Sequence, residues 1–196
     1  MPTLERRTVV RTLLADRGNL LVIAGLGAPA WDVTDAGDHP LNFPLWGGMG
    51  GAAAMGLGLA LAQPERRVLV LTGDGEMLMG LGSLATMGVQ RPGNLALVVL
   101  DNEHYGETGM QPSHTKFGID LAACASACGF GASTVATTMP QVTSLRDEIH
   151  RARGPLFAQV KINADKLPLV LPARDGTHLK NRFREALLGP SAHFQR

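Results

Sequence analysis

The sequence has few aromatic residues, almost no net charge and no long apolar segment, and each shortage excludes a class of function. Aromatic residues make up 5% of the 196 residues, too few for a platform on which single-stranded nucleic acid stacks. The net charge of +1 provides no general attraction for nucleic acid or a membrane surface. The N-terminal segment MPTLERRTVV lacks the apolar core of a signal peptide, and the small-residue stretch 47–62 is too short to span a bilayer. We therefore expect a cytoplasmic protein without membrane or nucleic-acid partners.

Cysteine is scarce as well. Cys124 and Cys128 are the two cysteines, and four residues of separation on a predicted helix put them on one face. One such pair cannot hold an iron–sulfur cluster. Because free cysteine usually packs as a small apolar side chain, we predict that both belong to the core.

Apolar runs alternate with helical patterns along the chain. The predicted strands lie in NLLVIAGLG, RRVLVLTGDG, NLALVVLDN, the segment 132–136 and PLFAQVKI. Helical spacing of apolar residues predicts helices in LERRTVVRTLLADRG, GGAAAMGLGLALA, LGSLATMGVQRPG, DLAACASACGFG, MPQVTSLRDEIHRARG and HLKNRFREALLG. Unbroken apolar strands between helices are typical of a parallel sheet covered on both faces. We predict a three-layer α/β domain over residues 1–196 with five or six strands, in which 165–196 form a C-terminal extension and helix.

Two polar segments follow apolar strands directly. Gly73-Asp74-Gly75 follows one strand and Asp101-Asn102 follows another, and ligands of such sheets bind outside the carboxyl ends of the strands. Carboxylate and amide oxygens suit Mg²⁺, which is commonly completed by phosphate oxygens. A helix beginning near Glu76 would direct free N–H groups at such a phosphate. Two ordinary turns are the alternative interpretation.

The segment GDGEMLMGLGSLATMGVQRPGNLALVVLDN resembles the diphosphate-binding motif of thiamine diphosphate enzymes, which opens with Gly-Asp-Gly and closes with Asn-Asn. Asp101 stands where the motif has its first Asn, and Asn102 matches the second. The resemblance implies that Asp74 and Asn102 bind Mg²⁺ through side chains and His104 through its carbonyl. The cofactor-binding residues it implies are Gly47, Gly48, Met49, Gly73, Asp74, Gly75, Glu76, Asn102, His104, Tyr105 and Gly106.

The segment LWGGMGGAAAMGLGLALA resembles the stretch that precedes Gly-Asp-Gly in the same enzymes. There a bulky apolar side chain bends the cofactor, and Met49 is the matching residue. By the same resemblance, the Gly47 carbonyl accepts a hydrogen bond from the cofactor's aminopyrimidine. Simple core packing is the alternative role for Met49.

Within this superfamily, DNEHYGETGMQPSHTKFGIDLAACASACGF is similar to decarboxylases of sulfopyruvate and phosphonopyruvate. YGETGMQ is also similar to β subunits of 2-oxoacid–ferredoxin oxidoreductases, but those carry cluster-binding cysteines. In the superfamily the glutamate that activates the cofactor belongs to a separate pyrimidine-binding domain, and 196 residues account for one domain only. The resemblance therefore implies a β subunit that pairs with a pyrimidine-binding α subunit in an α2β2 or larger hetero-oligomer, with the glycine-rich face at 46–58 as the docking surface.

The expected activity is decarboxylation of an anionic 3-substituted pyruvate, dependent on thiamine diphosphate and Mg²⁺. A carboligase of the acetolactate synthase type and a non-catalytic regulatory module that binds thiamine diphosphate or a nucleotide are the alternatives. His104 and His114 are candidates for proton transfer near neutral pH. Candidates for contacts with the substrate's anionic end, each of which could equally be a solvated surface residue, are His104, Ser113, His114, Thr115, Lys116, Arg174, Lys180 and Arg182.

Overall fold

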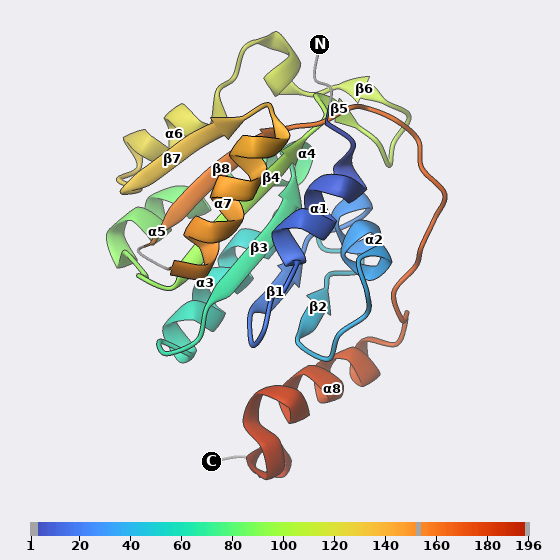
Figure 1. The fold of residues 1–196 in the computed structure, drawn as a ribbon, viewed down its shortest axis with the longest axis vertical. Helices are drawn as coiled ribbons and strands as arrows, with labels where there is room; N and C mark the ends of the chain where they lie inside the picture. Colours follow the sequence, from blue (N-terminus) through green and yellow to red (C-terminus); the bar gives the residue numbers. More distant parts are fainter. Residues whose placement is uncertain (1–3, 152–153, 195–196) are drawn as a thin grey trace.

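The computed structural model describes residues 4–151 and 154–194, which are arranged around a six-stranded sheet (Figure 1). The strand order is β2-β1-β3-β4-β8-β7, and every pair of neighbours is parallel. The strands are β1 (Leu21–Ala24), β2 (Asn42–Pro44), β3 (Val68–Gly73), β4 (Leu95–Asp101), β7 (Ala132–Ala136) and β8 (Leu156–Lys161). The prediction of a parallel sheet is confirmed, and β2 supplies the sixth strand.

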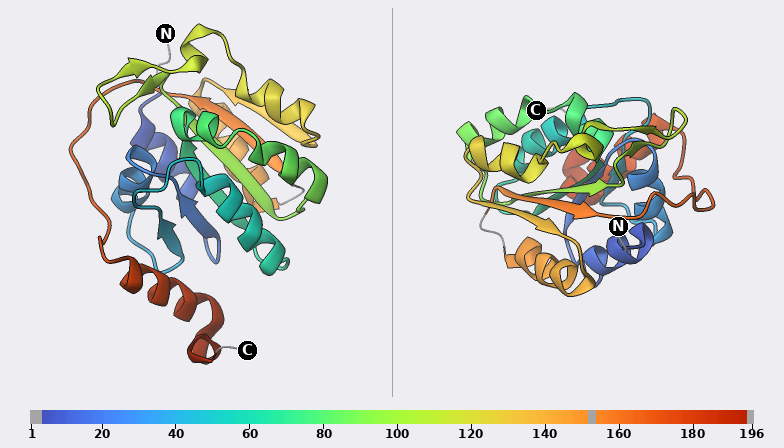
Figure 2. Two further views of the ribbon diagram at one scale, coloured as in Figure 1. Left: turned by 180° about the vertical axis from the view of Figure 1, so that it is seen from behind. Right: turned by 90° about the horizontal axis from the view of Figure 1, so that it is seen from above.

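Helices cover both faces of the sheet (Figures 1 and 2). One face is covered by α1 (Arg6–Leu14), α2 (Ala28–Asp35) and α7 (Met139–Arg151), and the other by α3 (Ala52–Ala62), α5 (Ser83–Gln90) and α6 (Leu121–Ala127). Successive side chains of β3 point to opposite faces of the sheet, so that Leu69 packs under one helix layer and Val70 under the other. This arrangement is the predicted three-layer α/β fold.

The elements missed by sequence patterns are short. They are α2, β2, the hairpin of β5 (His104–Tyr105) and β6 (Gln111–Pro112), and the 3-10 helices η1 (His114–Phe117) and η2 (Gly189–His193). Two or three residues are too few to show a period of two, and Pro29 makes the first turn of α2 read as a loop. Helix α4 (Asp74–Met79) begins at Asp74 itself, two residues before the predicted start.

The chain reverses its direction of travel across the sheet between β1 and β3. From β1 it goes to β2 on one side, whereas β3 and β4 continue on the other side. The carboxyl ends of β1 and β3 thus flank a crevice of the type in which α/β proteins bind ligands. Asp74 follows β3 directly and so lies at this crevice.

After β8 the chain follows an irregular path to α8 (Gly176–Leu188), which lies beside β2 (Figure 1). The two elements pack through an edge-to-face contact of Phe43 and Phe183, whose ring centroids are 5.6 Å apart. The Trp46 Nε1–H donates to the Ala173 carbonyl at 2.8 Å. Cys124 and Cys128 are free, half-buried and packed against the core, as predicted. Within residues 4–151 and 154–194, no helix combines the length and apolar character needed to cross a bilayer.

Candidate active site

A cavity of about 750 Å³ lies at the carboxyl ends of the central strands. Of the residues predicted from sequence, it is lined by Met49, Gly73, Asp74, Gly75, Glu76, Asn102, His104, Tyr105 and Gly106. Gly47 and Gly48 precede Met49 in an exposed loop but are not among the lining residues. The fold therefore brings the Gly-Asp-Gly turn, the Asp-Asn turn and Met49 together, although they are far apart in sequence.

Asp74 is the buried carboxylate of this cavity, with 2% of its surface exposed. The Ser113 and Thr115 hydroxyls both contact Oδ2, the latter at 3.3 Å, so neither contact uses Oδ1. Burial raises the pKa of Asp74 to about 6. A buried carboxylate that keeps Oδ1 available can ligate a cation, so the burial of Asp74 is compatible with its predicted role as a metal ligand.

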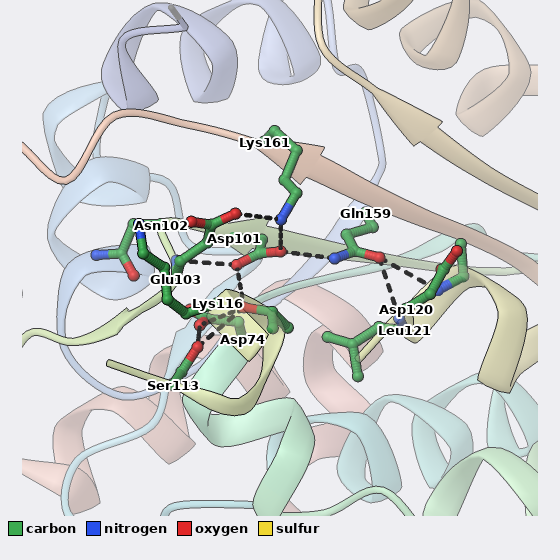
Figure 3. A network of polar contacts seen from close by, with 12 residues as sticks. Asp74, Asp101, Asn102, Glu103, Ser113, Lys116, Asp120, Leu121, Gln159 and Lys161 are labelled. Carbon is green, nitrogen blue, oxygen red and sulfur yellow. Dashed lines mark hydrogen bonds and ion pairs between the residues drawn. The ribbon is translucent and has the colours of Figure 1, made fainter. Parts of the chain in front are cut away.

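Asp101, the departure from the family motif, is fully buried and surrounded by donors (Figure 3). Lys161 Nζ lies 2.8 Å from Oδ2, and Gln159 Nε2 donates to the same oxygen at 2.6 Å. Thr115 donates to Oδ1 at 2.7 Å. Burial by itself would raise the pKa of Asp101, but these hydrogen bonds outweigh it and lower the pKa. The negative charge of Asp101, at the motif's first Asn position, is thus balanced by Lys161 and by hydrogen bonds from Gln159 and Thr115.

The pairing of Asp101 with Lys161 follows from the register of strands β4 and β8. Asp101 on β4 is paired directly with Lys161 on β8, so the two side chains leave the sheet side by side. Gln159, two residues earlier on β8, also accepts hydrogen bonds from the Leu121 and Ala122 amides at 3.1 and 3.3 Å. Figure 3 shows the resulting network, which connects the metal-ligand candidate Asp74, through Thr115 and Asp101, to the start of α6.

We expect Lys161→Met to lower the free energy of unfolding by about 3 kcal/mol, because it leaves the Asp101 carboxylate buried without its counter-ion. Asp101→Asn in the same chain should recover most of that loss. Lys116→Met is the matched control, since Lys116 is half-exposed and its ion pair with Glu103, at 3.3 Å, should contribute less than about 1 kcal/mol. Urea denaturation of the four chains measures these differences. Equal destabilisation by Lys161→Met and Lys116→Met would contradict the interpretation.

The Asp-Asn turn is fixed locally. Asn102 Oδ1 accepts from the His104 amide at 2.9 Å, and His104 Nδ1 lies 2.8 Å from the Asn102 carbonyl oxygen. The turn leads into the β5–β6 hairpin, whose Tyr105 ring packs over Gly75. A Cβ at Gly75 would lie 2.6 Å from that ring, so this glycine is required for the hairpin to close over the Gly-Asp-Gly turn.

The other predicted substrate contacts do not gather at the cavity. Ser113 and Thr115 are buried under Asp74 and are not solvated loop residues. His114 is exposed, with Nδ1 3.0 Å from the Tyr105 hydroxyl. Arg182 on α8 pairs with Asp38 at 2.6 Å. None of the residues His114, Lys116, Arg174, Lys180 and Arg182 lines the cavity.

Four charged residues on the cavity wall were not predicted from the sequence, namely Arg6, Glu107, Asp165 and Lys166. Arg6 is only 8% exposed, and its Nε lies 2.9 Å from Asp32 Oδ2. The available signal was a pair of arginines in the first turn of α1, where the helix dipole disfavours positive charge. Asp32 supplies the tertiary reason for this pair, because the Nε atoms of Arg6 and Arg7 lie 2.9 and 3.2 Å from its buried carboxylate.

The donor set fits a diphosphate cofactor held through a cation. The part of the chain that the structure describes has no cluster of three or more His, Cys, Asp or Glu side chains suited to a metal. The predicted site uses other donors: one carboxylate, one amide and one main-chain carbonyl, with phosphate oxygens completing the set. A methyl group added at Gly73 would meet no atom within 4 Å, so there is open space beside Asp74 for such a group.

The fold and the site define a cofactor-binding α/β domain with its ligand cavity at the carboxyl ends of a parallel sheet. Residues 26–160 match the family model of the thiamine pyrophosphate enzyme, C-terminal TPP binding domain. The chain belongs to this family, and the resemblance seen in its motifs is confirmed. Thiamine diphosphate is accordingly its cofactor.

Curated relatives and solved structures agree with this assignment. The chain is 37% identical over 186 residues to sulfopyruvate decarboxylase subunit beta of Methanothermobacter thermautotrophicus, covering 95% of this chain and 97% of the relative. It is 36% identical to phosphonopyruvate decarboxylase of Streptomyces viridochromogenes, covering 87% of this chain and 43% of that protein. The crystal structure of benzoylformate decarboxylase from Polynucleobacter necessarius has the same fold, with a TM-score of 0.69 and 21% identity over 86% of this chain and 35% of that one.

Proposed function

We propose that this chain is the β subunit of a Mg²⁺-dependent, thiamine diphosphate-dependent decarboxylase that acts on an anionic 3-substituted pyruvate such as sulfopyruvate or phosphonopyruvate. The observation that carries the proposal is the meeting of Asp74, Asn102 and Met49 on one cavity wall. The similarity over nearly the whole length of a sulfopyruvate decarboxylase β subunit supports the same reaction class.

In this proposal Asp74 and Asn102 hold Mg²⁺ through their side-chain oxygens, and His104 contributes its carbonyl. The availability of Asp74 Oδ1 supports this assignment, since both hydroxyl contacts use the other oxygen. When bound, thiamine diphosphate supplies the electron sink for the loss of carbon dioxide. Met49 would contact the bound cofactor, and the β5–β6 hairpin would limit the access of water to the cavity that both line.

The substrate's anionic end would meet positive charge supplied by Arg6 and Lys166. Both line the cavity, and Arg6 is buried there, where an ion pair is less screened by solvent. Among the predicted substrate contacts after Asn102, His104 lines the same cavity, whereas His114 and Lys116 do not. An arginine also offers paired N–H donors that match the oxygens of a sulfonate or phosphonate.

The proposed partner is a pyrimidine-binding α subunit that docks on the glycine-rich face at 46–58. Cβ atoms added at Gly47, Gly48, Gly51 or Gly58 would meet nothing within 4 Å, so the face is open to close approach. Gly56 differs, because a Cβ there would lie 2.1 Å from Val70; its role is packing of α3 on the sheet. Exposed Met49 and Met55 add apolar surface to the same face.

The test is a substrate panel on the reconstituted pair with Mg²⁺ and thiamine diphosphate. We expect kcat/KM for sulfopyruvate or phosphonopyruvate to exceed that for pyruvate by about 30- to 150-fold, since a paired anion contributes about 2–3 kcal/mol. Release of carbon dioxide and aldehyde is measured for each compound, and acetolactate is assayed with pyruvate. Acetolactate as the main product would contradict the proposal in favour of a carboligase.

A further inference from the structure

Glu76 lies in the first turn of α4 with 5% of its surface exposed, and its carboxylate lies between three separate chain segments. Oε2 accepts from the Thr72 hydroxyl at 2.7 Å and from the Leu26 amide at 3.2 Å. Oε1 accepts from the Ala52 amide at 3.3 Å. One side chain thus joins the end of β3, the loop after β1 and the start of α3.

Each of these segments carries part of the cavity. Leu26 lines it directly, the Thr72 segment continues into Gly73 and Asp74, and the Ala52 segment follows the loop that holds Met49. The backbone packs closely around Glu76 and at the far end of α4. A Cβ at Gly25 would lie 1.9 Å from Glu76 Oε2, and a Cβ at Gly80 would lie 2.4 Å from the Gly50 carbonyl oxygen. The loop with Met49 is therefore held against α4 at both ends of that helix.

Packing alone does not account for a carboxylate in this place. A buried carboxylate is costly unless its oxygens are hydrogen-bonded, and an apolar side chain of the same size would fill the volume. What the carboxylate adds is two acceptor oxygens on one rigid plane, which bind donors from all three segments at once. Glutamine cannot replace it, because its NH₂ group would face a backbone N–H at either Leu26 or Ala52.

We propose that Glu76 is a positioning residue that fixes the loop carrying Met49 at a set distance from Asp74. The carboxylate acts through Met49 and does not itself touch reacting atoms. Its catalytic consequence rests on the proposed function: Met49 supports the reacting part of the cofactor, whereas Asp74 anchors the diphosphate. Loss of Glu76 should therefore affect turnover more strongly than cofactor affinity, because displacement by about 1 Å can cost about a hundredfold in rate.

The test compares Glu76→Gln with Glu148→Gln, a control at an exposed position of α7. Amide hydrogen exchange of the full chain without cofactor is the first measurement. For Glu76→Gln we expect exchange at residues 24–27 and 49–53 to become about tenfold faster, with β8 unchanged. In the reconstituted enzyme, kcat should fall by more than about tenfold while the cofactor Kd changes less than about threefold.

Thr72→Val provides a second variant with nearly the same volume in case Glu76→Gln does not fold. It removes only the hydroxyl that donates to Glu76 at 2.7 Å. We therefore expect a smaller increase in amide exchange at residues 24–27 and 49–53. Unchanged exchange at 49–53 in either folded variant would overturn the proposal, as would an equal loss of kcat and cofactor affinity. Faster exchange combined with a wild-type enzyme that has no decarboxylase activity would leave the positioning role standing and contradict the proposed function instead.

Discussion

Asp74→Asn should weaken the Mg²⁺-dependent binding of thiamine diphosphate by at least about a hundredfold, because loss of a direct ligand should cost no less than the roughly 10–100-fold typical of losing a residue that only orients one. Asp74 supplies the single carboxylate among the proposed Mg²⁺ ligands, so the substitution removes the negative charge while keeping the side chain's shape. Asparagine also retains an oxygen that can accept from Ser113, whose hydroxyl contacts Oδ2. Calorimetric titration of the cofactor into the reconstituted enzyme, with and without Mg²⁺, measures the change.

The stability of the same variant distinguishes lost ligation from lost structure. The pKa of Asp74 is raised to about 6 by burial, above its ordinary value, so the folded metal-free chain binds a proton more tightly than the unfolded chain. Stability from this group is therefore present at low pH and is lost as the pH rises through about 6. At pH 7.5 without Mg²⁺, Asp74→Asn should melt no lower than the wild type. Wild-type cofactor affinity in this variant would remove Asp74 from the site.

Asp120→Asn is the matched control for the charge change. Asp120 is exposed and caps α6 by accepting from the Ala123 amide at 2.9 Å. It does not line the cavity, and asparagine is also a good N-cap residue. Cofactor affinity should stay within about twofold of the wild type, and any larger loss would indicate that general negative charge near the sheet, rather than a ligand at Asp74, controls binding.

The main layers of the fold could be predicted because their signals are local. The strands β3 and β4 are apolar throughout and end at Gly-Asp-Gly and Asp-Asn, so the sequence showed both their burial and their carboxyl ends. Strand β2 and helix α2 gave no such signal. Their existence depends on pairing of Asn42–Pro44 with β1 and on packing against α1, which are tertiary contacts that no short window contains.

The site was predictable to the extent that it resides in motifs. Asp74, Asn102 and Met49 came from spacing and resemblance and line one cavity. The residues that hydrogen-bond Asp101 could not be predicted in this way. Strand register brings Lys161 and Gln159 to Asp101, and the turn into η1 brings Thr115 there. Glu76 shows the difference most clearly. Its place beside Asp74 suggested a diphosphate contact, whereas its carboxylate is engaged by Leu26, Ala52 and Thr72.

The Asp101–Lys161 pair also bears on how the family motif can vary. A second carboxylate so close to Asp74 would oppose its ionisation, and Asp101 does raise the pKa of Asp74, after the larger effect of burial. Lys161 and Gln159 limit this effect by binding Asp101 from β8. The departure from Asn is thus accompanied by a cation on the neighbouring strand, and the two positions should be exchanged together in any redesign of the motif.

Purified alone, this chain should release no measurable carbon dioxide from any 2-oxo acid, and addition of a pyrimidine-domain partner should produce turnover. Four carboxylates line the cavity in the described residues: Asp74, Glu76, Glu107 and Asp165. The first is the proposed metal ligand and the second is bound by backbone amides, so neither is available to activate the cofactor's aminopyrimidine. Glu107 and Asp165 are exposed, the former on the hairpin beside the metal turn and the latter in the C-terminal extension.

The assay measures aldehyde formation by each subunit separately and by the mixture, with saturating thiamine diphosphate and Mg²⁺. An activating acid on the partner predicts a signal for the mixture only, and its loss when the partner's acid is replaced. Glu107→Gln and Asp165→Asn in this chain should then leave the activity of the mixture within about tenfold of the wild type, a smaller loss than the 10²–10⁴-fold contribution typical of acid–base catalysis. Turnover by the solitary chain would contradict the two-subunit model, and its abolition by Glu107→Gln or Asp165→Asn would identify the activating acid within these 196 residues.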